Sequence, residues 1–247
     1  MNAVGVIPAR WGSTRLPGKS LIDLCGKPLI VWVLERAAQA SRLSHVVVAT
    51  DDERIAAVVK AAGGDVAMTR PDHPSGTDRV AEAVQDLGAD LVINIQGDEP
   101  LIDPATIDAL VDVMQAASDW DMATLVVPLS ADAAGDPSVV KVVWDETGRA
   151  LYFSRSVIPH VRDGAESAPE SGYWRHIGIY AYQHAFLQRL VATAPCATEI
   201  AEKLEQLRAL HIGGRIKVLQ GRSGGPGVDT ADDVAYAELA LREAGLA

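Results

Sequence analysis

The sequence predicts an α/β protein with an open, mostly parallel, Rossmann-like sheet, helices on both faces, and extra antiparallel strands in its second half. Strand-like and helix-like segments alternate through residues 1–123 with short connections, which is typical of a doubly wound sheet. The run HVVVAT at residues 45–50 is continuously apolar apart from its ends, as in a strand buried on both faces. After Ala123 several strand-like segments follow one another, which predicts antiparallel pairing.

The elements of the first half follow from apolar patterning and from residues that begin or end helices. We expect strands at residues 3–9, 45–50, 65–68 and 90–96, and helices at residues 28–40, 51–64, 77–88 and 103–117. Pro28 suits the first position of its helix, because the N–H that proline lacks would have no intrahelical partner there. Thr77 and Asp103 are suited to cap the third and fourth helices.

The second half is expected to add antiparallel strands and then return to helices. Strands are predicted at residues 123–129, 139–146, 150–156, 173–182 and 215–220, and helices at residues 184–194, 199–214 and 230–245. Thr230 and Asp233 have the spacing of a capping box. Because no repeat or low-complexity linker divides the chain, we expect one domain over residues 1–247, with the antiparallel strands near 128–183 projecting as a subdomain.

Composition and charge exclude several classes of function. The formal net charge is −11, so nucleic acid is not an expected partner. No apolar run approaches the length of a membrane span, and the first residues do not have the layout of a signal peptide. The chain has 2 cysteines, Cys25 and Cys196, and neither forms a metal-type or redox pair, so we expect a reduced, cytoplasmic protein.

The loop after the first strand gathers Arg10, Arg15 and Lys19 in an otherwise acidic chain. It is not a Walker loop, because five residues separate Gly12 from Gly18 where that motif has four. No G-x-G-x-x-G follows a strand, so a dinucleotide site has no support. A solvated basic loop is the plain interpretation, but ligands bind at the carboxyl ends of parallel strands, which favours a polyphosphate site.

Two acidic segments follow other expected elements. Asp98 lies in the turn QGDEP, directly after a buried strand. Such a turn is often only a turn, but a carboxylate at this edge is also suited to Mg²⁺ and substrate phosphates. Glu99 is expected to point the other way and to support the loop. Asp229 precedes the last helix, and acids are common there without any role in binding.

The segment IPARWGSTRLPGK, residues 7–19, resembles the signature loop of the sugar-acid cytidylyltransferases. QGDEP, RHIGIYAY at 175–182 and LEQLR at 204–208 are similar to the branch whose acceptor is 3-deoxy-manno-octulosonate (KDO). The resemblance implies a nucleotide-diphospho-sugar transferase type of fold. It also implies transfer of CMP from CTP to the 2-hydroxyl of the sugar acid, with release of pyrophosphate, a requirement for Mg²⁺, and a homodimer assembled through the antiparallel subdomain.

The resemblance also assigns residues to roles. It implies that Asp98 and Asp229 hold the metal and act in catalysis with Arg10 and Lys19. Nucleotide contacts are implied for Ala9, Arg10, Arg15, Lys19, Arg70, Ser75 and Gln96, and sugar contacts for Arg155, His176, Tyr180, Glu205 and Gln206. Without the resemblance Ser75 would be a helix cap, His176 a structural histidine, and residues 204–208 part of a core-facing helix.

Other functions remain open on the sequence. The acceptor could be another 2-keto sugar acid, such as a sialic or legionaminic-type acid. A non-catalytic nucleotide-binding regulator would need neither both aspartates nor a sugar pocket. A glycosyltransferase would usually carry Asp-x-Asp after the central strand, whereas this chain has Gly97-Asp98-Glu99.

Overall fold

The computed structural model describes residues 1–12, 16–117, 119–162, 172–222, 225 and 227–247. Its main sheet has, in spatial order, β11 (Ile216–Gln220), β7 (Met122–Leu129), β10 (Tyr173–Gln183), β6 (Leu91–Asn94), β1 (Ala3–Ala9), β4 (His45–Thr50) and β5 (Asp65–Met68). All neighbours in this order are parallel except those of β10, which is antiparallel to both β6 and β7. The mostly parallel sheet predicted from the sequence is therefore confirmed.

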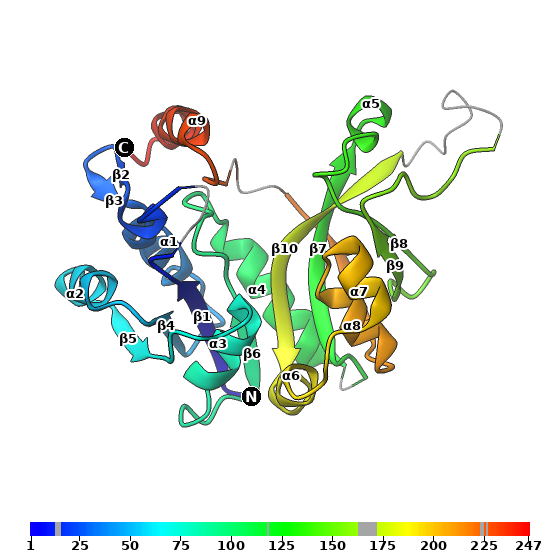
Figure 1. The fold of residues 1–247 in the computed structure, drawn as a ribbon, viewed down its shortest axis with the longest axis horizontal. Coiled ribbons are helices and arrows are strands. Elements are labelled where there is room, and N and C mark those ends of the chain that lie inside the picture. Colours follow the sequence, from blue (N-terminus) through cyan, green and yellow to red (C-terminus); the bar gives the residue numbers. More distant parts are fainter. Residues whose placement is uncertain (13–15, 118, 163–171, 223–224, 226) are drawn as a thin grey trace.

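Helices cover both faces of this sheet, as expected (Figure 1). One face packs on α1 (Leu29–Ala37), α2 (Glu53–Ala61) and α4 (Pro104–Ala116), and the other on α3 (Gly76–Ala83), α6 (His184–Val191) and α8 (Gln206–His211). In β1, Ile7 belongs to the first apolar cluster, whereas Val4 and Val6 belong to the second. This alternation follows from the period of two residues along a strand. The last helix, α9 (Ala231–Glu243), adds Ala237 and Leu241 to the first cluster.

The added antiparallel strands form a hairpin of β8 (Lys141–Trp144) and β9 (Ala150–Ser154). β8 also pairs with the first half of β10, at Arg175. In Figure 1 the hairpin lies at the opposite end of the sheet from β5, beside α7 (Ala197–Glu202) and α8. Residues 163–171, between the strands predicted at 150–156 and 173–182, lie outside the described residues. The single domain and the dimerisation role of residues 128–183 stay predictions.

Two details of the predicted helices are wrong. The helix expected over 199–214 is two helices, α7 and α8, because Lys203 adopts a left-handed conformation with φ of 54°, which an α-helix cannot contain. The cap of α3 is Ser75 and not Thr77, since the Ser75 side chain accepts from the backbone N–H of Asp78. The predicted cap Asp103 and the capping box of Thr230 and Asp233 are confirmed.

In the described part of the chain, no helix has the length and apolarity needed to cross a membrane.

The ends of β1 and β6 approach each other closely at Gly97. A Cβ added there would lie 2.8 Å from the Pro8 carbonyl oxygen, and backbone cannot yield as a flexible side chain can. We expect Gly97→Ala to lower the free energy of unfolding by about 1–3 kcal/mol, measured by urea denaturation. Gly135→Ala is the control, because its nearest atom would be 3.8 Å away. Equal stability of the two variants would contradict this account.

Candidate active site

Two adjoining cavities lie at the carboxyl edge of the parallel strands, where an open α/β sheet binds its ligands. Their volumes are about 750 Å³ and about 340 Å³, and they are called here the larger and the smaller cavity. Residues that line both are Pro8, Gly76, Gln96 and Asp229. The cavities are therefore neighbouring chambers with a shared boundary, which suits a pair of ligands that must touch.

The smaller cavity is lined by the loop after β1, by residues 73–76 and by residues 96–98. Ala9, Arg10, Lys19, Ser75 and Gln96 all line it, as predicted for nucleotide contacts. Lys19 begins the short 3-10 helix η1 (Lys19–Leu21), which follows Gly18 in a left-handed conformation. Trp11 lies over Gly18, where an added Cβ would be 3.0 Å from its ring. The predicted Arg15 lies outside the described residues.

The Lys19 ammonium lies between the two predicted acids. Its Nζ is 2.7 Å from Oδ2 of Asp98 and 3.3 Å from Oδ1 of Asp229. The side chains are 17%, 32% and 36% exposed, respectively, so solvent screens these ion pairs only in part. The backbone N–H of Val228 donates to the Asp98 carbonyl at 2.8 Å, which ties the segment before α9 to the loop after β6. The structure thus brings together two acids that sequence spacing could not pair.

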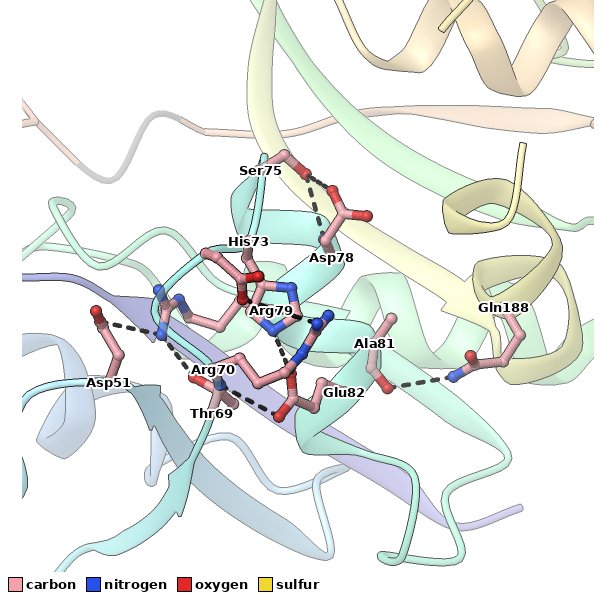
Figure 2. Close-up of polar contacts among 11 residues, drawn as sticks. Asp51, Thr69, Arg70, His73, Ser75, Asp78, Arg79, Ala81, Glu82 and Gln188 are labelled. Carbon is pink, nitrogen blue, oxygen red and sulfur yellow. Dashed lines mark hydrogen bonds and ion pairs between the residues drawn. The ribbon is translucent and has the colours of Figure 1, made fainter. Parts of the chain in front are cut away.

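Within the segment from Thr69 to Glu82, whose polar contacts Figure 2 shows, residues 73–76 and Arg79 line the smaller cavity. Ser75 caps α3, and its hydroxyl also donates to Oδ2 of Asp78 at 2.6 Å. Because Ser75 lines the smaller cavity too, it both caps the helix and faces the site. His73 is almost fully buried and contacts Glu82. Arg70 pairs with Glu82, is 66% exposed, and lines neither cavity. The structure therefore does not bring the predicted nucleotide contact Arg70 into the site.

Arg79 is a cation of the smaller cavity that the sequence reasoning missed. It is 4% exposed and lies 3.1 Å from Oδ1 of Asp51 and 2.5 Å from Oγ1 of Thr69. Figure 2 shows these contacts at the base of α3. The ion pair joins α3 to the end of β4, so Arg79 fixes the wall. Arg79 lies inside the helix predicted over residues 77–88, and no residue pattern of that helix indicated a role in binding.

The larger cavity collects four predicted sugar contacts, namely His176, Tyr180, Glu205 and Gln206. The His176 and Tyr180 rings lie 5.4 Å apart between centroids, and the Tyr180 hydroxyl donates to Oε1 of Gln206 at 3.4 Å. Gln206 is 4% exposed, and its Nε2 has no hydrogen-bond partner among the described residues. A buried amide without a partner is costly, so this donor suits a ligand oxygen.

Arg155 is not in the larger cavity. Its Nε donates to the Glu202 carbonyl at 2.7 Å and its guanidinium NH1 to the Pro137 carbonyl at 3.0 Å. Arg175 lines the cavity instead. Strict alternation along β10 would place Arg175 and His176 on opposite faces of the strand, yet residues 175–178 all line the cavity. The register shift of β10 lies further along, between Ile177 and Tyr180.

Glu99 lines the larger cavity and not the smaller one, which agrees with the expectation that it points away from Asp98. Its role in supporting the loop stays a prediction. Burial raises the pKa of its carboxyl to about 7, with a further rise from the charge of Asp98 and an opposing effect of Arg175. Asp98 and Glu99 therefore serve different chambers: Asp98 lines the smaller cavity and Glu99 the larger one. Neighbouring residues of one turn point to opposite sides of the shared boundary.

The smaller cavity holds cations and paired acids, the larger cavity is polar, and both lie at the carboxyl edge of an α/β sheet. These are the features expected of a nucleotide-binding enzyme. The profile of the family described as cytidylyltransferase matches residues 4–216. The chain therefore belongs to the cytidylyltransferase family, as the resemblance of its loop indicated.

Relatives and solved structures agree with this assignment. The 3-deoxy-manno-octulosonate cytidylyltransferase of Syntrophobacter fumaroxidans is 51% identical over 95% of this chain and 94% of its own length. That of Bdellovibrio bacteriovorus is 47% identical over 100% of both chains. A solved structure of CMP:2-keto-3-deoxy-manno-octonic acid synthetase complexed with CTP has a TM-score of 0.95 at 45% identity, covering 99% of this chain and 100% of that one. A cytidylyltransferase from Leptospira borgpetersenii, at 17% identity and a TM-score of 0.67, shares the fold.

The buried His176 predicts a specific loss of stability in acid. Burial lowers its pKa from 6.5 to about 3, so the folded protein binds fewer protons than the unfolded chain between these values. Stability is therefore complete above pH 6.5 and falls as the pH drops towards 3, by about 2 kcal/mol between pH 7 and pH 5. We expect His176→Gln to remove about this much of the pH dependence.

Urea denaturation of the ligand-free protein at pH 7 and pH 5 checks this expectation. His211→Gln is the control for the loss of a histidine as such, because His211 is exposed at the end of α8. If the His176 variant lost as much stability in acid as the unmodified chain, the histidine would not be the group that resists protonation.

Proposed function

We propose that this chain transfers CMP from CTP to the anomeric 2-hydroxyl of KDO, giving CMP-KDO and pyrophosphate for lipopolysaccharide biosynthesis. The observation that carries the proposal is similarity over nearly the whole chain to 3-deoxy-manno-octulosonate cytidylyltransferases. The TM-score of 0.95 to a synthetase complexed with CTP supports it as well. The two adjoining cavities support it further, because each offers the chemistry that one of the substrates needs.

The smaller cavity is the place for CTP. Arg10 and Lys19 line it, and Arg79 adds a third cation in its wall. Guanidinium groups suit phosphate oxygens as planar forks, and the Lys19 ammonium suits them as a point charge. Most of the catalysis in phosphoryl and nucleotidyl transfer comes from positioning and charge neutralisation. In this site Arg10 and Lys19 would hold the triphosphate, with its α-phosphorus at the boundary of the larger cavity.

Asp98 and Asp229 fit a divalent cation. They already hold one positive charge, the Lys19 ammonium, and carboxylates are suited to Mg²⁺. Groups of three or more potential metal ligands do not occur among the described residues, as expected for an ion that takes its other ligands from substrate phosphates and water. When bound, Mg²⁺ would neutralise phosphate charge and make the attacking hydroxyl more acidic. Lys19 would then be released to the triphosphate.

The larger cavity is the place for the sugar acid. The unpartnered Nε2 of Gln206 can donate to a sugar hydroxyl, and Glu205 can accept from one. Arg175 lines the same cavity, and we assign to it the substrate carboxylate that the sequence resemblance gave to Arg155. His176 is neutral near pH 7, because burial lowers its pKa to about 3, so it would bind through hydrogen bonding and not through charge.

A pyrophosphate-release assay tests the function. We expect release with CTP, Mg²⁺ and KDO together, and little with UTP, with a sialic acid, or without an acceptor. Release only with a different keto acid would move the chain to another branch of the family. Binding of CTP without release under any condition would favour a nucleotide-binding regulator.

The homodimer and the cytoplasmic location remain predictions, testable by light scattering and cell fractionation.

The metal assignment predicts the effect of removing one carboxylate. Asp98→Asn should reduce pyrophosphate release by about two orders of magnitude or more at saturating Mg²⁺, because the cation loses a charged ligand. Asp232→Asn is the matched control, since Asp232 lies exposed in the first turn of α9. Full turnover of the Asp98 variant at saturating Mg²⁺ would end the assignment of Asp98 as a metal ligand.

The assignment of the sugar carboxylate predicts a selective change in affinity. Arg175→Met should raise the KM for KDO by about 10-fold or more, the loss of a charged hydrogen bond, while the KM for CTP changes by less than about 2-fold. Arg42→Met, at an exposed ion pair with Asp112, should change neither. A rise in the KM for CTP instead would mean that Arg175 serves the triphosphate.

A further inference from the structure

Lys141 in β8 is fully buried, with 0% of its surface exposed. Its Nζ donates to three backbone carbonyls, those of Asp136 at 3.0 Å, Val139 at 2.7 Å and Arg155 at 2.5 Å. A buried ammonium is costly unless each of its donors has a partner, and here the three N–H groups meet three acceptors. Desolvation lowers the pKa of this lysine. Such a group is suited to hold backbone segments together.

The first two of these carbonyls belong to one rim of the larger cavity. The segment 136–140, called here the rim segment, joins α5 (Ala131–Ala134) to β8. Ser138, Val139 and Val140 of this segment line the cavity. Lys141 itself is not among the lining residues. Its hydrogen bonds therefore fix the shape of the rim from behind.

Arg155 joins the rim segment to the end of α7. NH1 of its guanidinium donates to the Pro137 carbonyl at 3.0 Å, and its Nε to the Glu202 carbonyl at 2.7 Å. The Glu202 carboxylate in turn accepts from the backbone N–H of Arg155 at 2.9 Å and from the Ser154 hydroxyl at 2.6 Å. Arg155 thus donates to the backbone carbonyl and to the carboxylate of Glu202, and it also donates to the rim segment at Pro137.

Glu202 ends α7. Residues 203–206, called here the wall segment, follow it and all line the larger cavity. Lys203 has a φ of 54°, a conformation that costs a non-glycine residue about 1–3 kcal/mol and persists only when its surroundings hold it. The bonds of Glu202 hold the chain immediately before this residue, and the backbone N–H of Leu204 donates to the Glu199 carbonyl immediately after it.

We infer that Lys141, Arg155 and Glu202 form a clamp that fixes the rim segment against the wall segment and so positions the acceptor-binding groups of the larger cavity. The three are positioning residues, since none of them lines either cavity. The inference rests on the proposed function for the identity of the acceptor, but its structural part does not. The clamp touches the walls of the larger cavity, and neither Lys19 nor Asp98 takes part in it.

The test compares kinetic constants for the two substrates. Arg155→Met should raise the KM for KDO by about 10-fold, leave the KM for CTP within about 2-fold, and change kcat less than the KM for KDO. Glu202→Ala should act in the same direction, and Glu202→Gln should recover part of the loss, because its one amide oxygen can still accept from the backbone N–H of Arg155 while its NH2 group can donate to the Ser154 hydroxyl. Lys27→Met, at an exposed ion pair with Glu35, is the control.

Hydrogen exchange supplies a readout that needs no substrate. In Arg155→Met and Lys141→Met, amides of the rim segment and the wall segment should exchange faster together, while those of β1 and β4 keep their rates. Rates unchanged in both segments would overturn the clamp, and so would equal rises in KM for KDO and CTP or an unchanged KM for KDO. Absence of pyrophosphate release by the unmodified chain would instead defeat the proposed function, leaving the exchange result to judge the clamp.

Discussion

The ammonium of Lys19 lies between two carboxylates that come from distant parts of the sequence, 2.7 Å from Asp98 and 3.3 Å from Asp229. Two carboxylates facing one another repel, and a positive charge between them offsets this repulsion where the loop after β6 meets the segment before α9. Lys19 supplies that charge from the loop after β1. Its position in turn depends on the left-handed turn at Gly18 under Trp11. The geometry of the whole smaller cavity therefore depends on this balance of charge.

The second organising feature is β10, the reversed strand inside a parallel sheet. It separates β6, which leads into the acidic turn, from β7 and β11, and its first half carries the β8 hairpin. Residues 175–178 of β10 line the larger cavity in succession. The ends of β1 and β6 thus lead into the smaller cavity, and β10 lines the larger one.

Much of the fold was predictable because it depends on local patterns. Continuous apolar runs and capping residues identified the strands and helices of the first half, and the rule for strand ends located Lys19 and Asp98. Asp229 was paired with Asp98 only through family resemblance, since no local pattern reports a contact between distant segments. Arg155 was assigned to the sugar through family resemblance, and only the tertiary structure shows that it bonds to backbone carbonyls while Arg175 lines the larger cavity. The break at Lys203 was missed because Lys203 is not a glycine, the residue that would indicate a left-handed position at the end of a helix.

The boundary shared by the two cavities is thin, and Pro8, Gly76, Gln96 and Asp229 face both of them. A substitution at any of these positions would therefore change the lining of both cavities at once. Ser138 and Lys203 line only the larger cavity. A substitution there can reshape the larger cavity while the lining of the smaller one stays the same.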